Sequence, residues 1–147
     1  MIELGRGRAT STAAPQAFFE KWVDHDTWPT WSPDTEWVRV DGPVRTGTTG
    51  VLKPQGGPKV RFTISGCEPG REYTDTTKLP GATLVFRHTA AVTPDGTDLH
   101  VLVTIDGPLA RLWAVVMGKG FRESAQADLD RLVAVVESPA ESEVESA

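Results

Sequence analysis

A chain of 147 residues is long enough to form one domain with its own hydrophobic core, without disulfides or metal ions. The formal net charge is −5 and the lysines and arginines are scattered, which makes nucleic acid a poor candidate partner, because binding it requires a basic surface. The single cysteine, Cys67, excludes an internal disulfide and offers no metal-ligand spacing, so we expect a reducing compartment and no metal site.

The N-terminal part of the chain predicts one strand followed by two short helices. The first five residues lack the charged start and apolar run of a signal peptide, and we therefore expect a cytoplasmic protein. Weak alternation over residues 3–12 indicates a strand. Pro15 then opens a short helix with an apolar face, and the segment 25–33, which two prolines interrupt, indicates a second short helix or a tight loop.

Six further strands are predicted before residue 107. Residues 35–41 and 48–53 provide the first two, joined by a turn at Gly42-Pro43. Three tight turns divide residues 60–106 into four more strands: Glu68-Pro69-Gly70-Arg71, Leu79-Pro80-Gly81-Ala82 and Pro94-Asp95-Gly96-Thr97. Strands joined by such short turns pair with their neighbours in antiparallel fashion.

The last predicted element is a helix of about 30 residues, which begins at Pro108 and ends near Glu137. Its apolar residues recur at steps of three and four, so one face is buried: Leu109, Trp113, Met117, Phe121, Ala125, Leu129, Leu132 and Val136. Only this helix is long enough to cover the apolar face of a seven-stranded sheet. We expect one α+β domain over residues 1–137 and an acidic, disordered tail over residues 138–147.

The turns set the register of the sheet and thereby the composition of its buried face. A two-residue loop at Pro80-Gly81 pairs Tyr73 with His88, and the simplest closure of the preceding turn pairs Cys67 with Glu72. The shared parity places these residues on the inner face: Phe62, Ile64, Tyr73, Asp75, Thr77, Leu84, Phe86, His88, Ala90, Leu99, Val101, Val103 and Ile105.

Tyr73, Asp75 and His88 stand out as polar residues in this otherwise apolar face. Tyr73 and His88 are directly opposed, where side chains lie about 5 Å apart, and Asp75 is diagonal to His88, at roughly 7–8 Å or somewhat less, so the three are within mutual reach. A carboxylate, an imidazole and a phenol in a dry pocket could orient a ligand carbonyl or transfer a proton. The same three groups could also form a satisfied buried network without turnover, and we favour this network or a purely ligand-orienting role over catalysis.

Other histidines and tryptophans give weaker signals. His25 stands between two aspartates and is expected to be a surface capping residue, and His100 is expected to be solvated on the outer face. Three histidines in separate places do not form a metal site. Trp28, Trp31 and Trp37 either wall the mouth of a pocket, with Trp31 the better candidate, or plug the end of the core.

A series of short motifs runs along nearly the whole chain in a characteristic order and spacing: Trp28-Pro29-Thr30-Trp31-Ser32-Pro33, Asp41-Gly42-Pro43, Gly47-Thr48-Thr49-Gly50, Glu68-Pro69-Gly70-Arg71, Leu79-Pro80-Gly81-Ala82, Phe86-Arg87-His88, Asp95-Gly96-Thr97 and Gly107-Pro108-Leu109-Ala110. In this order they resemble bacterial members of the polyketide cyclase/dehydrase and lipid-transport group, in the START and birch-pollen-allergen superfamily (SRPBCC). The resemblance implies a helix-grip fold, in which a curved seven-stranded antiparallel sheet wraps around a long C-terminal helix and encloses a deep apolar cavity. The superfamily has no universal catalytic motif, so the resemblance assigns no catalytic residue.

These observations favour a protein that binds a hydrophobic or aromatic small molecule, lipid-like or polyketide-like, between sheet and helix. The expected ligand contacts are Trp31, Phe62, Ile64, Tyr73, Asp75, Thr77, Leu84, Phe86, His88, Val101, Val103, Trp113, Met117 and Phe121. One alternative is a polyketide cyclase or dehydratase that uses His88, Asp75 and Tyr73 for proton transfer, and a second is a partner-binding module like a co-chaperone. We expect no cofactor, no nucleic acid, no stable membrane insertion, and a monomer or homodimer.

Overall fold

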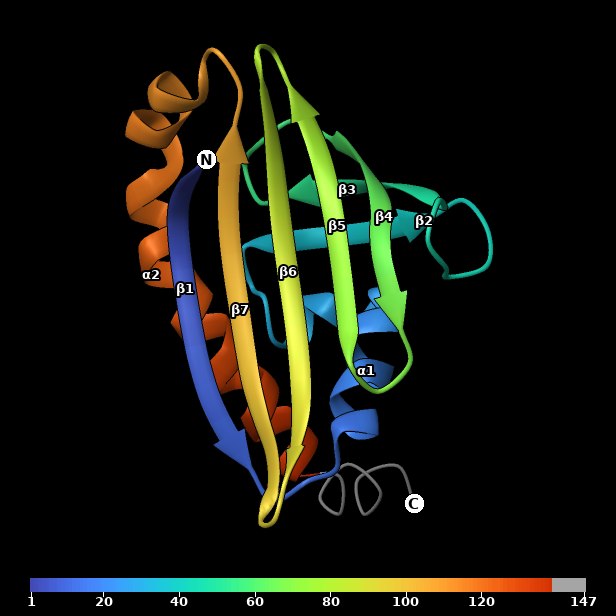
Figure 1. The fold of residues 1–147 in the computed structure, drawn as a ribbon. Coiled ribbons are helices and arrows are strands. Elements are labelled where there is room, and N and C mark those ends of the chain that lie inside the picture. Colours follow the sequence, from blue (N-terminus) through green and yellow to red (C-terminus); the bar gives the residue numbers. More distant parts are fainter. Residues whose placement is uncertain (139–147) are drawn as a thin grey trace.

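The computed structural model describes residues 1–138, so the predicted tail lies, apart from Ser138, outside the described residues. The elements are β1 (Ile2–Ser11), α1 (Pro15–Val23), the 3₁₀ helix η1 (His25–Thr30), β2 (Thr35–Val40), β3 (Thr49–Pro54), β4 (Val60–Glu68), β5 (Glu72–Leu79), β6 (Ala82–Thr93), β7 (Gly96–Asp106) and α2 (Ala110–Glu137). All seven strands pair antiparallel in one sheet of order β1-β7-β6-β5-β4-β3-β2 (Figure 1). The predicted α+β helix-grip fold is confirmed.

The register of the central hairpins is the predicted one. Tyr73 pairs with His88 across β5 and β6, and His88 pairs with Val101 across β6 and β7. The loop Pro80-Gly81 makes this possible, because proline supplies the first turn residue and Gly81 has a φ of 69°, which a residue with a side chain rarely adopts. The inner-face residues inferred from this parity are buried, except Phe86, which is half-buried.

One register prediction is wrong, at the turn between β4 and β5. The simplest closure pairs Cys67 with Glu72, but Cys67 pairs with Tyr73 instead. The cause is a bulge between Ile64 and Gly66, which adds one residue to β4 and displaces the pairing behind it by one position. Ahead of the bulge the pairing is as predicted, so the inner face keeps its composition there.

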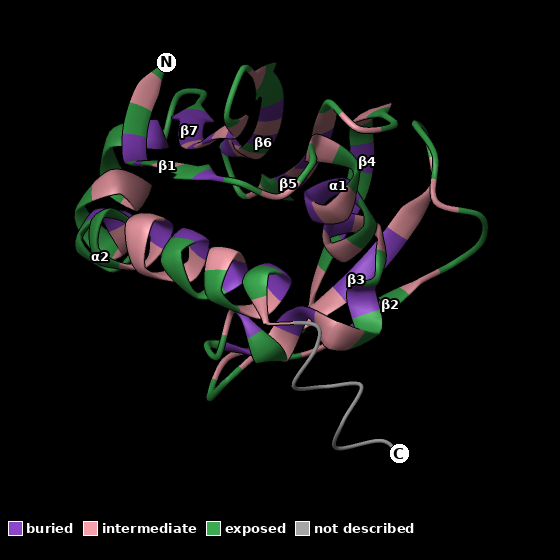
Figure 2. Cartoon of the chain, turned by 90° about the horizontal axis from the view of Figure 1, so that it is seen from below, coloured by how far each residue is buried: buried purple, intermediate pink, exposed green. Residues whose placement is uncertain are grey.

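Helix α2 packs most closely against β1, the strand at one edge of the sheet (Figure 2). Gly5 and Gly7 permit this approach: a Cβ atom at Gly5 would lie 2.5 Å from the carbonyl oxygen of Phe121, and one at Gly7 would lie 3.1 Å from that of Ala125. The two glycines of the helix itself, Gly118 and Gly120, do not border the space between helix and sheet. The close approach therefore depends on the strand.

The buried side chains form two hydrophobic clusters under the sheet. The larger cluster joins α1, η1 and the C-terminal half of α2 to the sheet around Phe18, Trp22 and Leu132, which are 0% exposed. The smaller cluster joins the start of β1 and the start of α2 to the first residues of β6 and the last residues of β7, around Leu4 and Ile105. No helix within residues 1–138 is long and apolar enough to cross a lipid bilayer.

Candidate ligand cavity

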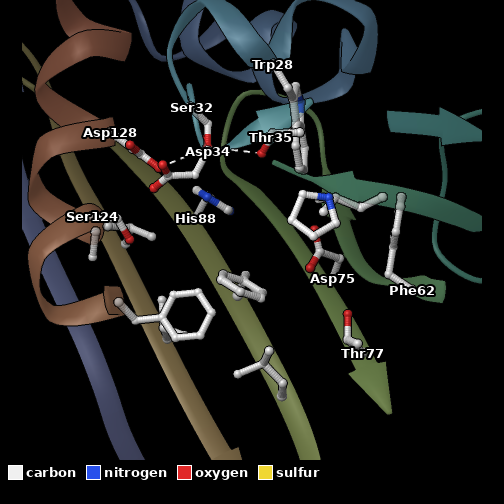
Figure 3. Close-up of a pocket in the computed structure, with 18 of the residues that line it drawn as sticks. Trp28, Ser32, Asp34, Thr35, Phe62, Asp75, Thr77, His88, Ser124 and Asp128 are labelled. Carbon is white, nitrogen blue, oxygen red and sulfur yellow. Dashed lines mark hydrogen bonds between the residues drawn. The ribbon is translucent and has the colours of Figure 1, made fainter. Parts of the chain in front are cut away.

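A cavity of about 370 Å³ lies between the two clusters, and residues of both clusters line it. Strands β4 to β7 form one wall and α2 the opposite wall, while η1 and the segment after it close one side (Figure 3). The volume falls in the range of roughly 300–1,000 Å³ that is usual for small-molecule sites. The lining is mostly apolar, and its polar side chains belong to Ser32, Asp34, Thr35, Asp75, Thr77, His88, Ser124 and Asp128.

All but three of the residues expected to contact a ligand border this cavity. The exceptions are Ile64, Tyr73 and Trp113. Ile64 and Tyr73 are 0% exposed and belong to the larger cluster. Trp113 packs on the smaller cluster and its indole N–H donates to the carbonyl oxygen of Pro80 at 2.8 Å.

Several lining residues do not follow from the sheet pattern. Trp28, Ser32, Asp34 and Thr35 come from η1 and the segment after it, and these are joined by Leu52, Pro54, Val60, Leu79, Ser124, Ala125, Asp128 and Leu129. A signal existed for five of them. Ala125 and Leu129 belong to the predicted buried face of the last helix, and Trp28 is one of the tryptophans considered as a pocket wall. Ser124 and Asp128 follow Met117 and Phe121 at steps of three and four, so they lie on the same face of α2.

The position of His25 corrects a prediction. It was expected at the surface, but it is only 5% exposed, and its Nε2 lies 2.8 Å from the Tyr73 hydroxyl oxygen. Its ring packs against Trp28 with a centroid separation of 4.8 Å, and burial lowers its pKa to about 4. Phe18, Trp22 and His25 follow one another at steps of four and three, a helical spacing that outweighs the flanking aspartates.

His88 presents one ring nitrogen to the backbone and the other towards the cavity (Figure 3). Nδ1 lies 3.2 Å from the backbone carbonyl oxygen of Tyr73, and because a carbonyl only accepts, Nδ1 carries the proton. Burial lowers the pKa of His88 to about 4, so at neutral pH the ring is uncharged and Nε2 is a hydrogen-bond acceptor. The rings of Trp22 and Trp31 hold the imidazole, with centroids 5.5 Å and 6.3 Å away.

Asp75 is a buried carboxyl group on the cavity wall, 6% exposed. Burial raises its pKa to about 7, and the nearby Tyr73 hydroxyl opposes this rise only in part. The short hydrogen bond of that hydroxyl goes to His25, at 2.8 Å, and the same hydroxyl also interacts with the Asp75 carboxyl. The carboxyl keeps acceptor capacity and borders the cavity, so it is available to a molecule there.

A second cluster of polar side chains lies where α2 meets the segment after η1. Ser32 Oγ donates to Asp128 Oδ2 at 3.0 Å, and the Thr35 hydroxyl lies 3.2 Å from Ser32 Oγ (Figure 3). Arg131 also donates to Asp128 at 3.0 Å. The pKa of Asp128 is raised, by burial first and also by the negative charge of Asp34. This side of the cavity thus carries negative charge.

The described residues 1–138 hold no group of three His, Cys, Asp or Glu side chains arranged to bind a metal ion. The cavity can instead enclose an apolar molecule and form a small number of hydrogen bonds to it. Three predicted polar residues, Tyr73, Asp75 and His88, are brought together in the sheet, but Tyr73 turns its hydroxyl to His25, away from the cavity surface.

Comparison with known proteins agrees with this architecture. Residues 6–137 match the model of the family described as polyketide cyclase / dehydrase and lipid transport. Because the match covers most of the chain, the protein belongs to this family. No curated protein matches the sequence.

Solved structures similar to this one share its fold at low identity. The di-domain ARO/CYC StfQ from the steffimycin biosynthetic pathway matches with a TM-score of 0.75 and 14% identity over 95% of this chain and 52% of that one. Protein NE0264 from Nitrosomonas europaea matches with a TM-score of 0.72 and 13% identity over 95% and 97% of the two chains. Ara h 8.0201 matches with a TM-score of 0.65 and 19% identity over 90% and 96%.

Proposed function

We propose that the protein binds a hydrophobic or aromatic small molecule, lipid-like or polyketide-like, in the cavity between sheet and α2. The observation that carries this proposal is the cavity of about 370 Å³ with a mostly apolar lining. Removing apolar surface from water is favourable by about 25 cal/mol per Å². An apolar ligand that covers this lining therefore binds more favourably than water. A partner-binding module would be favoured if Trp31, Phe86 and Phe121 filled this space, and they leave it open.

The family description supports the proposal, since it includes both polyketide chemistry and lipid transport. The similar di-domain StfQ belongs to the biosynthetic pathway of steffimycin. We propose that residues 1–137 act as one ligand-binding domain in the cytoplasm, as a monomer or homodimer. Size-exclusion chromatography with light scattering tests the oligomeric state, and cell fractionation tests the location.

A matched pair of variants tests the site. The uncharged dye N-phenyl-1-naphthylamine becomes fluorescent in apolar surroundings, and we expect saturable binding to the wild-type protein. Ser124→Phe places a large side chain into the cavity from α2 and should weaken dye binding at least tenfold, about 1.4 kcal/mol. Glu123→Phe adds the same side chain at the neighbouring exposed position and should leave the affinity unchanged. Equal affinities for both variants would contradict the proposed site.

A second candidate function is proton transfer in the manner of a cyclase or dehydratase. The specific observation behind it is Asp75, a carboxyl on the cavity wall whose pKa of about 7 suits a general acid or base. It would act beside His88, whose Nε2 accepts a hydrogen bond and can orient the substrate, and Tyr73 would hold His25 and stay outside the reaction.

The two functions differ in what happens to the bound compound. Native mass spectrometry of protein purified from its source identifies any retained ligand. Incubation of this ligand with the protein in D₂O then reports proton exchange at carbon, which an acid or base at Asp75 would catalyse and Asp75→Asn would abolish. A ligand recovered without deuterium at carbon would contradict the enzymatic candidate and agree with a binding protein.

A further inference from the structure

We propose that the cavity selects ligands by a hydrogen-bond donor, a hydroxyl or phenol group that donates to Nε2 of His88, and rejects ligands with a carboxylate or phosphate group. This inference rests on the proposed function and specifies the ligand class of the same cavity. It follows from the chemical character of the polar atoms that the wall offers to a ligand.

The first step concerns His88. Its Nδ1–H donates to the backbone carbonyl oxygen of Tyr73 at 3.2 Å, so Nε2 carries no proton and can only accept a hydrogen bond. The aromatic rings of Trp22 and Trp31 and the strand pairing with Val101 fix the imidazole in this orientation. A ligand acceptor, such as a carbonyl oxygen, finds no proton at this nitrogen, whereas a ligand hydroxyl does find an acceptor.

The second step concerns the charges of the lining. Asp34, Asp75 and Asp128 border the cavity, and none of the lining residues, all within 1–138, is a lysine or arginine. A carboxylate or phosphate that entered would lose its hydration without a positive partner, and it would also face like charges. Arg131 is no substitute, because it is engaged by Asp128 at 3.0 Å and does not border the cavity.

The third step concerns the donors of the lining. The indole N–H of Trp31 has no hydrogen-bond partner within residues 1–138, but it is covered by surrounding atoms and is not presented to the cavity. The hydroxyl protons of Ser32 and Thr35 are directed along their chain of hydrogen bonds to Asp128. The hydroxyls of Thr77 and Ser124 can accept as well as donate, so they fit a hydroxylated ligand too.

Three naphthalene probes of the same shape separate these effects: 2-naphthol, which has a donor, its methyl ether, which has none, and 2-naphthoate, which carries a negative charge. Each is titrated at pH 8 by displacement of N-phenyl-1-naphthylamine. We expect naphthol to bind about tenfold more tightly than the ether, in line with one hydrogen bond. We expect naphthoate to bind at least about tenfold more weakly than the ether.

Variants assign the preference to individual residues. His88→Phe should abolish the tenfold ratio between naphthol and its ether, while the same substitution at the half-exposed outer-face residue, His100→Phe, should keep it. Asp128→Asn should strengthen naphthoate binding, because it removes a negative charge from the lining. The Asp128→Asn variant and the wild-type binding ratios decide the inference even when His88→Phe does not fold.

The outcomes separate this inference from the proposed function. Equal binding of the three probes, or tightest binding of naphthoate, would overturn donor selection and leave binding in the cavity intact. Binding of the dye with no displacement by any probe would overturn it as well. Failure of the dye and of all three probes to bind would overturn the proposed function itself, and this inference with it.

Discussion

The larger hydrophobic cluster and the cavity lie side by side under one sheet, but their polar groups differ in their hydrogen-bond partners. In the larger cluster the Tyr73 hydroxyl meets His25 at 2.8 Å, and the indole N–H of Trp28 donates to the carbonyl oxygen of Trp22 at 3.0 Å. On the cavity wall, the Asp75 carboxyl interacts with the Tyr73 hydroxyl but keeps acceptor capacity, and the hydrogen bond of His88 uses Nδ1 and leaves Nε2 for a ligand.

This difference separates packing from binding. A buried polar group without a partner costs free energy, on the order of 1–3 kcal/mol. A folded chain tolerates that cost where the group contacts a ligand or solvent in a cavity, so polar groups with free capacity on the cavity wall mark the surface that serves binding. The indole N–H groups of Trp22 and Trp31 are different, because they are covered inside the larger cluster and have no partner within residues 1–138. The paired groups of the larger cluster serve stability.

The largest expected effect compares two phenylalanines. Phe18 is 0% exposed in the larger cluster, and Phe18→Ala should lower the free energy of unfolding by about 3–5 kcal/mol, because it opens a void in a filled core. Phe121 lies at the cavity with its ring 5.3 Å from that of Phe86, and Phe121→Ala should cost only about 1–2 kcal/mol, since the space beside it is already empty. Urea unfolding measures both. Equal costs would mean that the cavity wall is packed as tightly as the core.

The next effect concerns Asp75 and pH. In the unfolded chain its carboxyl ionises near the ordinary pKa of 3.8, whereas in the folded protein it ionises near 7. The folded state therefore holds more protons than the unfolded state between these values, and stability falls as the pH rises through this window. Asp75→Asn removes this loss, so the variant should match the wild type near pH 4 and be more stable at pH 8 by on the order of 2–4 kcal/mol.

The two buried histidines act in the opposite direction. His25 and His88 have folded pKa values of about 4 against an ordinary value of 6.5, so the unfolded chain takes up protons that the folded protein does not, and stability is lost as the pH falls from 6.5 towards 4. Together with Asp75 this predicts greatest stability near pH 6.5, measured by urea unfolding across pH 4–8. A wild-type protein whose stability is level over this range would contradict the burial of these groups.

The smallest effect compares two hydroxyl groups. Tyr73→Phe leaves Nε2 of His25 buried without a partner and should cost about 1–3 kcal/mol. Thr77→Val removes a hydroxyl that faces the cavity and forms no hydrogen bond within residues 1–138, and should change stability by no more than about 0.5 kcal/mol. Chemical denaturation of both variants at pH 7 tests this. A larger cost at Thr77 than at Tyr73 would reverse the assignment of packing and binding surfaces.

Local rules of turn chemistry and strand parity predicted much of the inner wall. Pro80-Gly81 fixes the pairing of Tyr73 with His88, and from that parity the inner position of Asp75 follows. The bulge beyond Ile64 did not follow, because the sequence of β4 permits both closures of its turn. The burial of His25 was predicted wrongly, because the prediction relied on its two flanking aspartates and not on its helical spacing from Trp22, and its partner Tyr73 is distant in sequence.

The cavity itself is beyond such rules. Whether a helix and a sheet leave space between them depends on the distance and angle at which they pack, and these result from side chains along the whole interface. The apolar stripe of α2 predicts which residues face the sheet, among them Met117 and Phe121, but it does not distinguish a residue that touches the sheet from one that faces empty space.

The contact at Gly5 and Gly7 has a consequence for how binding specificity can change. Because the backbone of α2 rests directly on β1 there, the width of the chamber is governed by two positions that no bound molecule touches. A methyl group at either one would collide with the backbone of α2, so the helix would have to move relative to β1. Ligand size can thus evolve at the seam between strand and helix, while the residues that recognise the ligand stay the same.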